Sequence, residues 1–70
     1  ELKIHPRDQQ ENIAVLARAE RLYEEFLHER NQLQEWIMHF RAILDTQDVA
    51  MIARHRAQLA EALDALEAQT

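Results

Sequence analysis

Hydrophobic and polar residues alternate at the spacing of an α-helix, in which successive residues are turned by about 100°. Between residues 13 and 27 the apolar side chains cover nearly half of the helical wheel, and Arg18, Arg21 and the glutamates occupy the other half. So wide an apolar face predicts a helix that packs against two neighbours. Its members are Ile13, Val15, Leu16, Ala19, Leu22, Tyr23, Phe26 and Leu27.

Two later segments carry narrower apolar stripes. Residues 33–44 leave Met38 opposite their stripe, which consists of Leu33, Trp36, Ile37, Phe40, Ile43 and Leu44. A polar break at residues 45–48 follows, and because Thr and Asp favour helix caps, Asp48 or Thr46 is expected to cap the last helix. One face of that helix carries Ile52, His55, Leu59, Leu63 and Leu66.

The polar stretch HERNQ, residues 28–32, separates the first two stripes. The stripes stay in phase across it, so a single helix from about residue 8 to residue 45 is one interpretation. Asn31 followed by Gln34 is typical of a helix start and favours a turn. A single long helix would span about 57 Å against about 30 Å for the last helix. Half of the first stripe would then face water, which also favours a turn.

The sequence therefore predicts an all-α fold, a small three-helix bundle over residues 8–70. Its helices are expected at about residues 8–27, 30–45 and 48–68, after a connector at residues 1–7, where Pro6 disfavours helix. The alternative is a long helix plus a short helix, which would form a swapped or helical dimer. The expected core consists of Ile13, Leu16, Leu22, Phe26, Leu33, Trp36, Phe40, Leu44, Ile52, Leu59, Leu63 and Leu66.

Composition narrows the range of functions. The chain has no Gly and no Cys, which excludes glycine-rich phosphate loops, disulfides and thiolate metal sites. Its 13 acidic and 8 basic residues leave a net charge of −5, so neither nucleic acid nor a membrane is an expected partner. No apolar run approaches the roughly 18 residues of a membrane span. The first residue is Glu1 rather than Met, from which we expect the chain to be part of a longer protein.

Four histidines suggest a metal site, and Glu24–His28 and Glu35–His39 each lie four residues apart. A metal site needs three or four convergent ligands, and no two histidines share a helical spacing of four, so these side chains are interpreted as solvated surface residues. His55 lies on the apolar face of the last helix. It is expected to be a neutral core or rim residue with one hydrogen bond, and a proton switch is the alternative.

Catalytic chemistry finds little support in the sequence. Ser is absent, and the carboxylates on the expected helices can pair with arginines, as in Arg21–Glu25 and Arg41–Asp45. We predict no catalytic, cofactor-binding or metal-ligating residue and no cofactor in this chain, which is not expected to be an enzyme. Met38 is interpreted as a lone exposed apolar residue, with a docking surface as the alternative.

The chain from Phe26 to Leu66 resembles the C-terminal helical lid of DnaK-type chaperones, the heat shock protein 70 family. The resemblance lies in the charged turn of FLHERNQ, the short stripe of Leu33, Ile37, Phe40 and Leu44, and the last helix that begins VAMI. The N-terminal LKIHPRD is similar to the segment that leads into the lid in the HscC-like branch. The resemblance implies a small bundle whose middle helix starts at His28 to Arg30, in a lid shorter than that of the best-known members.

The resemblance also implies a function. In the family, an ATPase domain that binds ATP and a β-sandwich peptide-binding domain lie upstream, and both are absent from this chain. The lid closes over bound unfolded polypeptide in the ADP state and opens when ATP binds, so it gates release without chemistry of its own. The expected partner is the peptide-binding domain of the same cytoplasmic parent chain, with unfolded polypeptides bound indirectly. The alternative is a stand-alone helical protein–protein interaction or dimerisation module, and the isolated fragment could form a homodimer.

Overall fold

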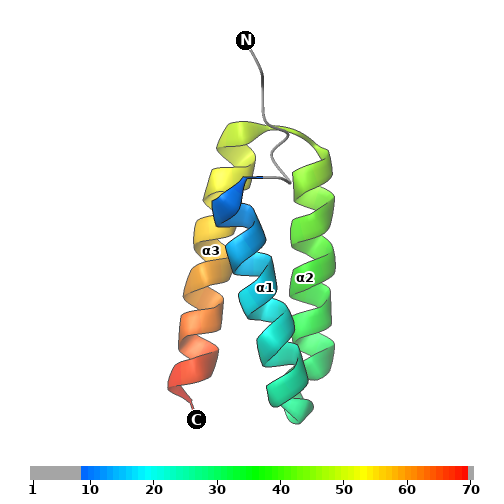
Figure 1. Ribbon diagram of the computed structural model, residues 1–70, viewed down its shortest axis with the longest axis vertical. Coiled ribbons are helices and arrows are strands. Elements are labelled where there is room, and N and C mark those ends of the chain that lie inside the picture. Colours follow the sequence, from blue (N-terminus) through cyan, green and yellow to red (C-terminus); the bar gives the residue numbers. More distant parts are fainter. Residues whose placement is uncertain (1–8, 70) are drawn as a thin grey trace.

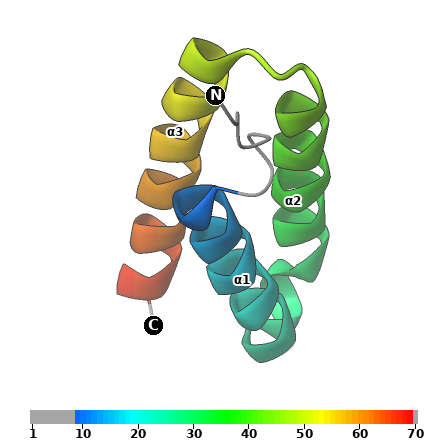
Figure 2. The ribbon, with the colours of Figure 1, turned by 45° about the horizontal axis from the view of Figure 1, so that its top comes forward.

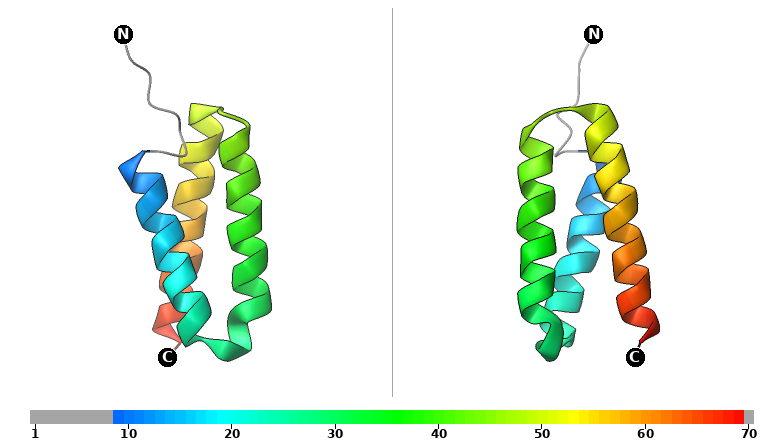
Figure 3. Two further views of the ribbon diagram at one scale, coloured as in Figure 1. Left: turned by 45° about the vertical axis from the view of Figure 1, so that its right-hand side comes forward. Right: turned by 180° about the vertical axis from the view of Figure 1, so that it is seen from behind.

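Three helices pack side by side in the computed structural model, which describes residues 9–69 (Figure 1). They are α1 (Gln10–Glu25), α2 (Arg30–Asp45) and α3 (Val49–Ala68), and a single 3-10 turn, η2 (Leu27–Glu29), joins α1 to α2. Each helix contacts the other two, and α2 runs antiparallel to both α1 and α3 (Figures 1, 2 and 3). The predicted all-α three-helix bundle is confirmed.

The chain turns between α1 and α2, as the polar HERNQ stretch predicts, but the turn begins earlier than expected. α1 ends at Glu25, and Phe26 leaves the helical region with φ −102° and ψ 84°. Its N–H still donates to the carbonyl of Leu22, and η2 then carries the chain to Arg30. The single long helix is therefore wrong for this chain. Asn31 lies inside α2 and does not cap it.

Arg30 explains how this turn closes without a glycine. Its Nε donates to the backbone carbonyl of Tyr23 at 3.0 Å, and its guanidinium lies 5.0 Å from the centre of the Tyr23 ring. The last carbonyls of a helix lack partners within the helix, and a basic side chain can satisfy one of them. Arg30 thus stabilises the C-terminal end of α1 from the first residue of α2.

The connection between α2 and α3 is tight and follows the predicted cap. The Oδ1 of Asp48 accepts a hydrogen bond from the N–H of Met51 at 3.1 Å, which confirms Asp48 as the N-cap of α3. The hydroxyl of Thr46 donates to the carbonyl of Ile43 and accepts from the N–H of Asp48. Gln47 between them has φ 59°, a left-handed conformation that costs energy for any residue other than glycine.

The core runs along the axis of the bundle, where the three apolar faces meet. It consists of Val15, Ala19 and Leu22 from α1, Leu33, Ile37, Phe40 and Leu44 from α2, and Ile52, Leu59, Leu63 and Leu66 from α3. Three predicted core residues, Leu16, Phe26 and Trp36, are only partly buried and pack against its edge. The core therefore differs from the prediction mainly in α1.

Ile13 is the predicted core residue that the structure contradicts, since half of its surface is exposed. The inward-facing line of α1 passes instead through Asn12, Val15 and Ala19, and Ile13 lies about 100° away from Asn12 around the helix. Because the apolar face of this segment is wide, the sequence does not fix which residues lie at the centre of the face, and the predicted centre is about one residue away from the observed one. A buried Asn shows where the centre lies.

Candidate functional site

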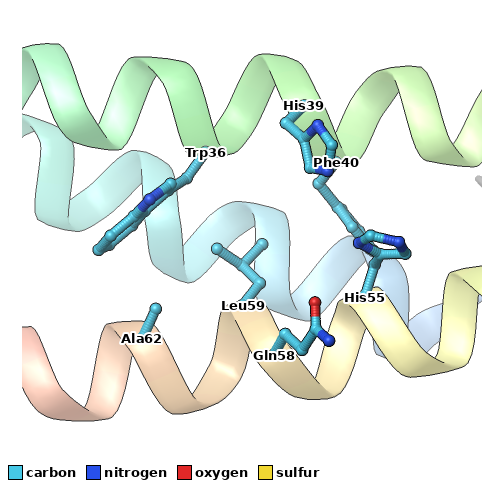
Figure 4. Close-up of a pocket in the computed structure, with 7 residues that line it drawn as sticks. All are labelled: Trp36, His39, Phe40, His55, Gln58, Leu59 and Ala62. Carbon is cyan, nitrogen blue, oxygen red and sulfur yellow. The ribbon is translucent and has the colours of Figure 1, made fainter.

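An open groove runs between α2 and α3 on one side of the bundle, with α1 behind it (Figure 4). Phe40 and Leu59 are buried in it, and the half-buried ring of Trp36 points from α2 toward Ala62 of α3. The groove holds about 210 Å³. An indole over an apolar floor, open to solvent along one side, defines a shallow apolar site rather than an enclosed pocket.

Two histidines lie at one end of this groove. His39 projects from α2 and is exposed, whereas His55 projects from α3 and is half-buried. Their ring centres are 5.3 Å apart and their planes are inclined by 62° (Figure 4). The partial burial of His55 matches the expected rim position, but the imidazole beside it was not foreseen.

The register of the α2–α3 hairpin is the signal that could have revealed this pair. Residues at equal distances from the connection of an antiparallel hairpin lie at about the same height. His39 precedes Gln47 by eight residues (47 − 39) and His55 follows it by eight (55 − 47). A search for histidines four residues apart on one helix cannot find two residues on different helices.

A buried polar contact joins the beginning of α1 to α3. Asn12 is fully buried, and its Oδ1 accepts a hydrogen bond from Nη1 of Arg56 at 3.0 Å. Nη2 of Arg56 lies 3.1 Å from Oε2 of Glu11, which is exposed. The half-buried guanidinium therefore has a neutral partner inside the bundle and a charged partner at the surface, which is the arrangement that makes burial of a polar amide tolerable.

A second arginine joins the other end of α3 to α1. Nε of Arg18 donates to Oε1 of Glu67 at 2.9 Å, and its Nη2 contacts both Asp64 and Glu67. These hydrogen bonds, with that to Asp64 the strongest, raise the pKa of Arg18 above its ordinary value although partial burial opposes the change. Arg18 and Arg56 thus clamp α1 to α3 at two heights, while Arg41 of α2 pairs with Glu20 of α1.

A further hollow lies where the α1–α2 turn meets the C-terminal end of α3. It is lined by Phe26, Leu27, Leu66 and Gln69 together with the charged side chains of the turn. Leu27 is 65% exposed beside it. This hollow is open to solvent, and its lining brings Glu25, His28 and Glu29 of the turn beside Phe26 and Leu66.

Three further predictions concern Met38, metal-ligating side chains and membrane-spanning helices. Met38 is 60% exposed on the outer side of α2, opposite the core, as the helical wheel indicates. Within residues 9–69, no group of three or more His, Asp or Glu side chains is placed to hold a metal ion. No helix in this part of the chain is long and apolar enough to cross a membrane. His5 and the LKIHPRD segment lie outside the described residues.

Comparisons with known proteins do not identify the chain: no family model, no curated protein and no solved structure matches it. The fold and the groove define a small helical bundle with an open, histidine-edged apolar groove.

Proposed function

We propose that the chain is the C-terminal lid subdomain of a DnaK-type chaperone of the HscC-like branch, which closes over the peptide-binding domain and gates release of unfolded polypeptide. The observation that carries this proposal is the position of the middle helix. α2 begins at Arg30, within the stretch from His28 to Arg30 where the resemblance puts its start. The start of α2 therefore lies where the resemblance expects it, which supports the proposal.

The connections between helices support a lid that moves as one body. A gate controls release by its position, so its helices must keep their arrangement when it swings. Arg18 and Arg56 tie α1 to α3, and Arg41 ties α2 to α1. Each of these ion pairs is at least partly exposed and by itself adds little to the stability of the fold. Together they connect all three helices around a shared apolar core.

The outer surface of the bundle also suits a lid that acts only by docking on a neighbouring domain. The apolar faces of its three helices are turned toward one another, so contacts with a neighbouring domain fall on outer faces that are mostly polar. Polar interfaces of this kind are typical of domains that separate and rejoin. We propose that the partner is the peptide-binding domain of the same parent chain, and that ATP acts on that parent rather than on this bundle.

The first experiment is to determine the mass of the native polypeptide that carries this segment, by immunoblot of source-cell extract with an antibody raised to the chain. A species many times heavier than 8.3 kDa is expected, because the proposed lid needs upstream domains. A species of about 8.3 kDa would overturn the lid and leave the stand-alone interaction module.

The second experiment measures release of a fluorescent unfolded peptide from the heavier protein, with and without residues 1–70. Removal of the lid is expected to speed release in the ADP state and to leave release in the ATP state nearly unchanged. Phe40→Asp, at a core position, should act like the deletion, whereas Met38→Asp on the exposed side of α2 is the matched control. Equal release rates for the deletion and the intact protein in the ADP state would contradict the gating function.

A further inference from the structure

We propose that the groove between α2 and α3 is a docking site for a basic amphipathic helix of another polypeptide. This inference concerns the bundle itself and does not depend on the lid function. The hollow in which Trp36 lies shares both Trp36 and Ala62 with a second hollow nearer the α1–α2 turn, so the two form one groove. Along α3 and its C-cap the groove extends from His55 to Gln69, fourteen residues (69 − 55) or about 21 Å of helix.

The lining of this groove differs from the rest of the surface in its charge. Charged residues make up 30% of the chain. Among the described residues that line the groove, however, Glu29 is the one Asp, Glu, Lys or Arg side chain. The hollow between α1 and α3 is instead lined by Glu11, Arg18 and Arg56. The cores of protein–protein interfaces are depleted of charged residues and enriched in aromatic ones, so the groove has the composition of an interface core.

A helix fits this groove better than an extended segment does. Both walls are helices whose backbone groups bond within α2 and α3, so the groove offers no strand edge to an extended peptide. A helix satisfies its own backbone hydrogen bonds and needs only side-chain contacts from the groove. The small side chain of Ala62 on α3 faces the ring of Trp36 on α2, which leaves room above it (Figure 4). A helix placed there would complete a four-helix bundle.

The borders of the groove favour a basic partner. Glu35 is exposed on α2, one turn before His39, which lines the groove. Glu61 is exposed on α3, one turn after Gln58, which also lines it. With Glu29 at the end near the α1–α2 turn, carboxylates therefore lie along both sides of an apolar floor.

The arginines of the bundle leave this acidic border largely unopposed. Arg18, Arg41 and Arg56 pair with carboxylates across the contacts that α1 makes with α3 and α2. Arg54 is exposed beside the groove only at the end near the α2–α3 connection. The complementary partner is a helix with Leu or Ile on one face and Lys or Arg along the edges of that face. The net charge of −5 also speeds its encounter with the chain.

The experiment uses the fluorescence of Trp36, which is the single tryptophan of the chain. The probe is a synthetic peptide of about 18 residues, five turns of helix, with Leu along one face, Lys on both borders of that face and no Trp. Its binding is expected to shift the emission of Trp36 to shorter wavelengths in a saturable way, because the docked helix excludes water from the indole. A control peptide with Glu in place of every Lys should bind about tenfold more weakly.

Charge reversal on the border of the groove tests the electrostatic part of the proposal. Glu61→Lys is expected to weaken binding of the Lys peptide about fivefold. The double variant Glu35→Lys/Glu61→Lys should bind the Glu peptide more tightly than the parent does. Glu24→Lys makes the same change of charge on α1, away from the groove, and should leave the affinity within about twofold of the parent. All three glutamates are exposed, so the variants are expected to keep the fold, which the helical circular dichroism signal checks.

Three results with the peptides would overturn the site: no saturable shift with the Lys peptide, equal binding of the two peptides, or equal weakening by Glu61→Lys and Glu24→Lys. Two other occupants are tested without peptide. A dimer in sedimentation, whose formation shifts the emission of Trp36 to shorter wavelengths, would assign the groove to a second copy of the chain. A shift to longer wavelengths on removal of residues 1–8 would assign it to the N-terminal segment of the same chain. Either result would contradict the proposal, which expects a monomer and an unchanged emission.

Discussion

At the scale of single residues, Arg18, Arg56 and Asn12 make the polar contacts that join α1 to α3. Asn12 occupies the inward-facing line of α1 at its first turn, where an apolar residue would usually lie, and Arg56 reaches it from α3. A buried amide is tolerated because it is hydrogen-bonded. Because this hydrogen bond forms only when Asn12 faces Arg56, it favours one orientation of α1 relative to α3. We therefore expect the contact to favour this register of α1 on α3 as well as to stabilise the fold.

Replacement of Asn12 by alanine tests this role. Asn12→Ala removes the neutral partner of the half-buried Arg56 and leaves a small cavity, so the free energy of unfolding should fall by about 1–3 kcal/mol. Urea unfolding followed by circular dichroism measures the change. Gln10→Ala, at an exposed position in the same turn, is the control and should stay within about 0.5 kcal/mol of the parent. An unchanged midpoint for Asn12→Ala would contradict a stabilising contact.

The clamp of Arg18 on Asp64 and Glu67 leads to a second prediction. Arg18→Gln should lower the free energy of unfolding by about 1 kcal/mol, because both partners are partly exposed and screened by water. The loss should shrink in about 1 M NaCl, where the screening length is only about 3 Å. Arg54→Gln, which removes the same charge from an exposed position on α3, should change stability less and should show no comparable salt effect.

The dependence of this clamp on pH follows from the direction of the pKa. The pKa of Arg18 is raised in the folded state, so the contribution of its charge is fully present below the ordinary arginine pKa and is lost only as the pH rises through the raised value. Titration of Arg18 therefore leaves the difference between parent and Arg18→Gln unchanged between pH 6 and 9, roughly the range in which such unfolding curves are recorded.

At the scale of the elements, periodicity and caps account for most of what the sequence predicted. The apolar stripe located α2 and α3 closely, and Asp48 marked the start of α3 because a side-chain cap is a local signal. The end of α1 could not be read in this way. It depends on Arg30, which contacts Tyr23 only once the chain has already turned. Local patterns predict local contacts, and this turn is closed by a contact between two helices.

Gln47 in the α2–α3 connection gives a prediction at this scale. A residue with a Cβ in the left-handed conformation costs about 1–2 kcal/mol, whereas glycine adopts it freely but loses more entropy on folding. Gln47→Gly should therefore raise the free energy of unfolding by about 0.5–1 kcal/mol. Gln47→Val, which is stiff at the Cβ, should lower it. Thermal melting of the two variants beside the parent measures both changes, and a glycine variant less stable than the parent would contradict the strain.

At the scale of the whole molecule, the candidate site and the clamps share one property that the sequence alone could not supply. His39 and His55, Arg18 and Asp64, and Asn12 and Arg56 are all pairs between helices. A helical wheel describes one helix at a time. It therefore predicts on which face of its helix each of these residues lies, but not which residue of another helix it contacts. Register between helices supplies the missing information, as the equal distances of the two histidines from Gln47 illustrate.

The core of the bundle is small, so the loss of a single buried side chain can remove most of the free energy of unfolding. A chain of this length nets only about 3–5 kcal/mol from its core, and truncation of a buried aromatic residue alone costs about 3–5 kcal/mol. Phe40 is 2% exposed in the middle of α2 and lines the groove that the two histidines border. Phe40→Asp adds the cost of burying a charge to the loss of the ring, so the sum exceeds the stability available.

Phe40→Asp is therefore expected to abolish the helical circular dichroism signal and the cooperative melting transition. Met38→Asp introduces the same charge two residues earlier, on the exposed side of α2, and should melt within a few degrees of the parent. The contrast separates the effect of a buried charge from that of added negative charge on a chain that is already acidic. If Phe40→Asp melts like Met38→Asp, the three helices do not share the core described here, and the groove between α2 and α3 loses its floor.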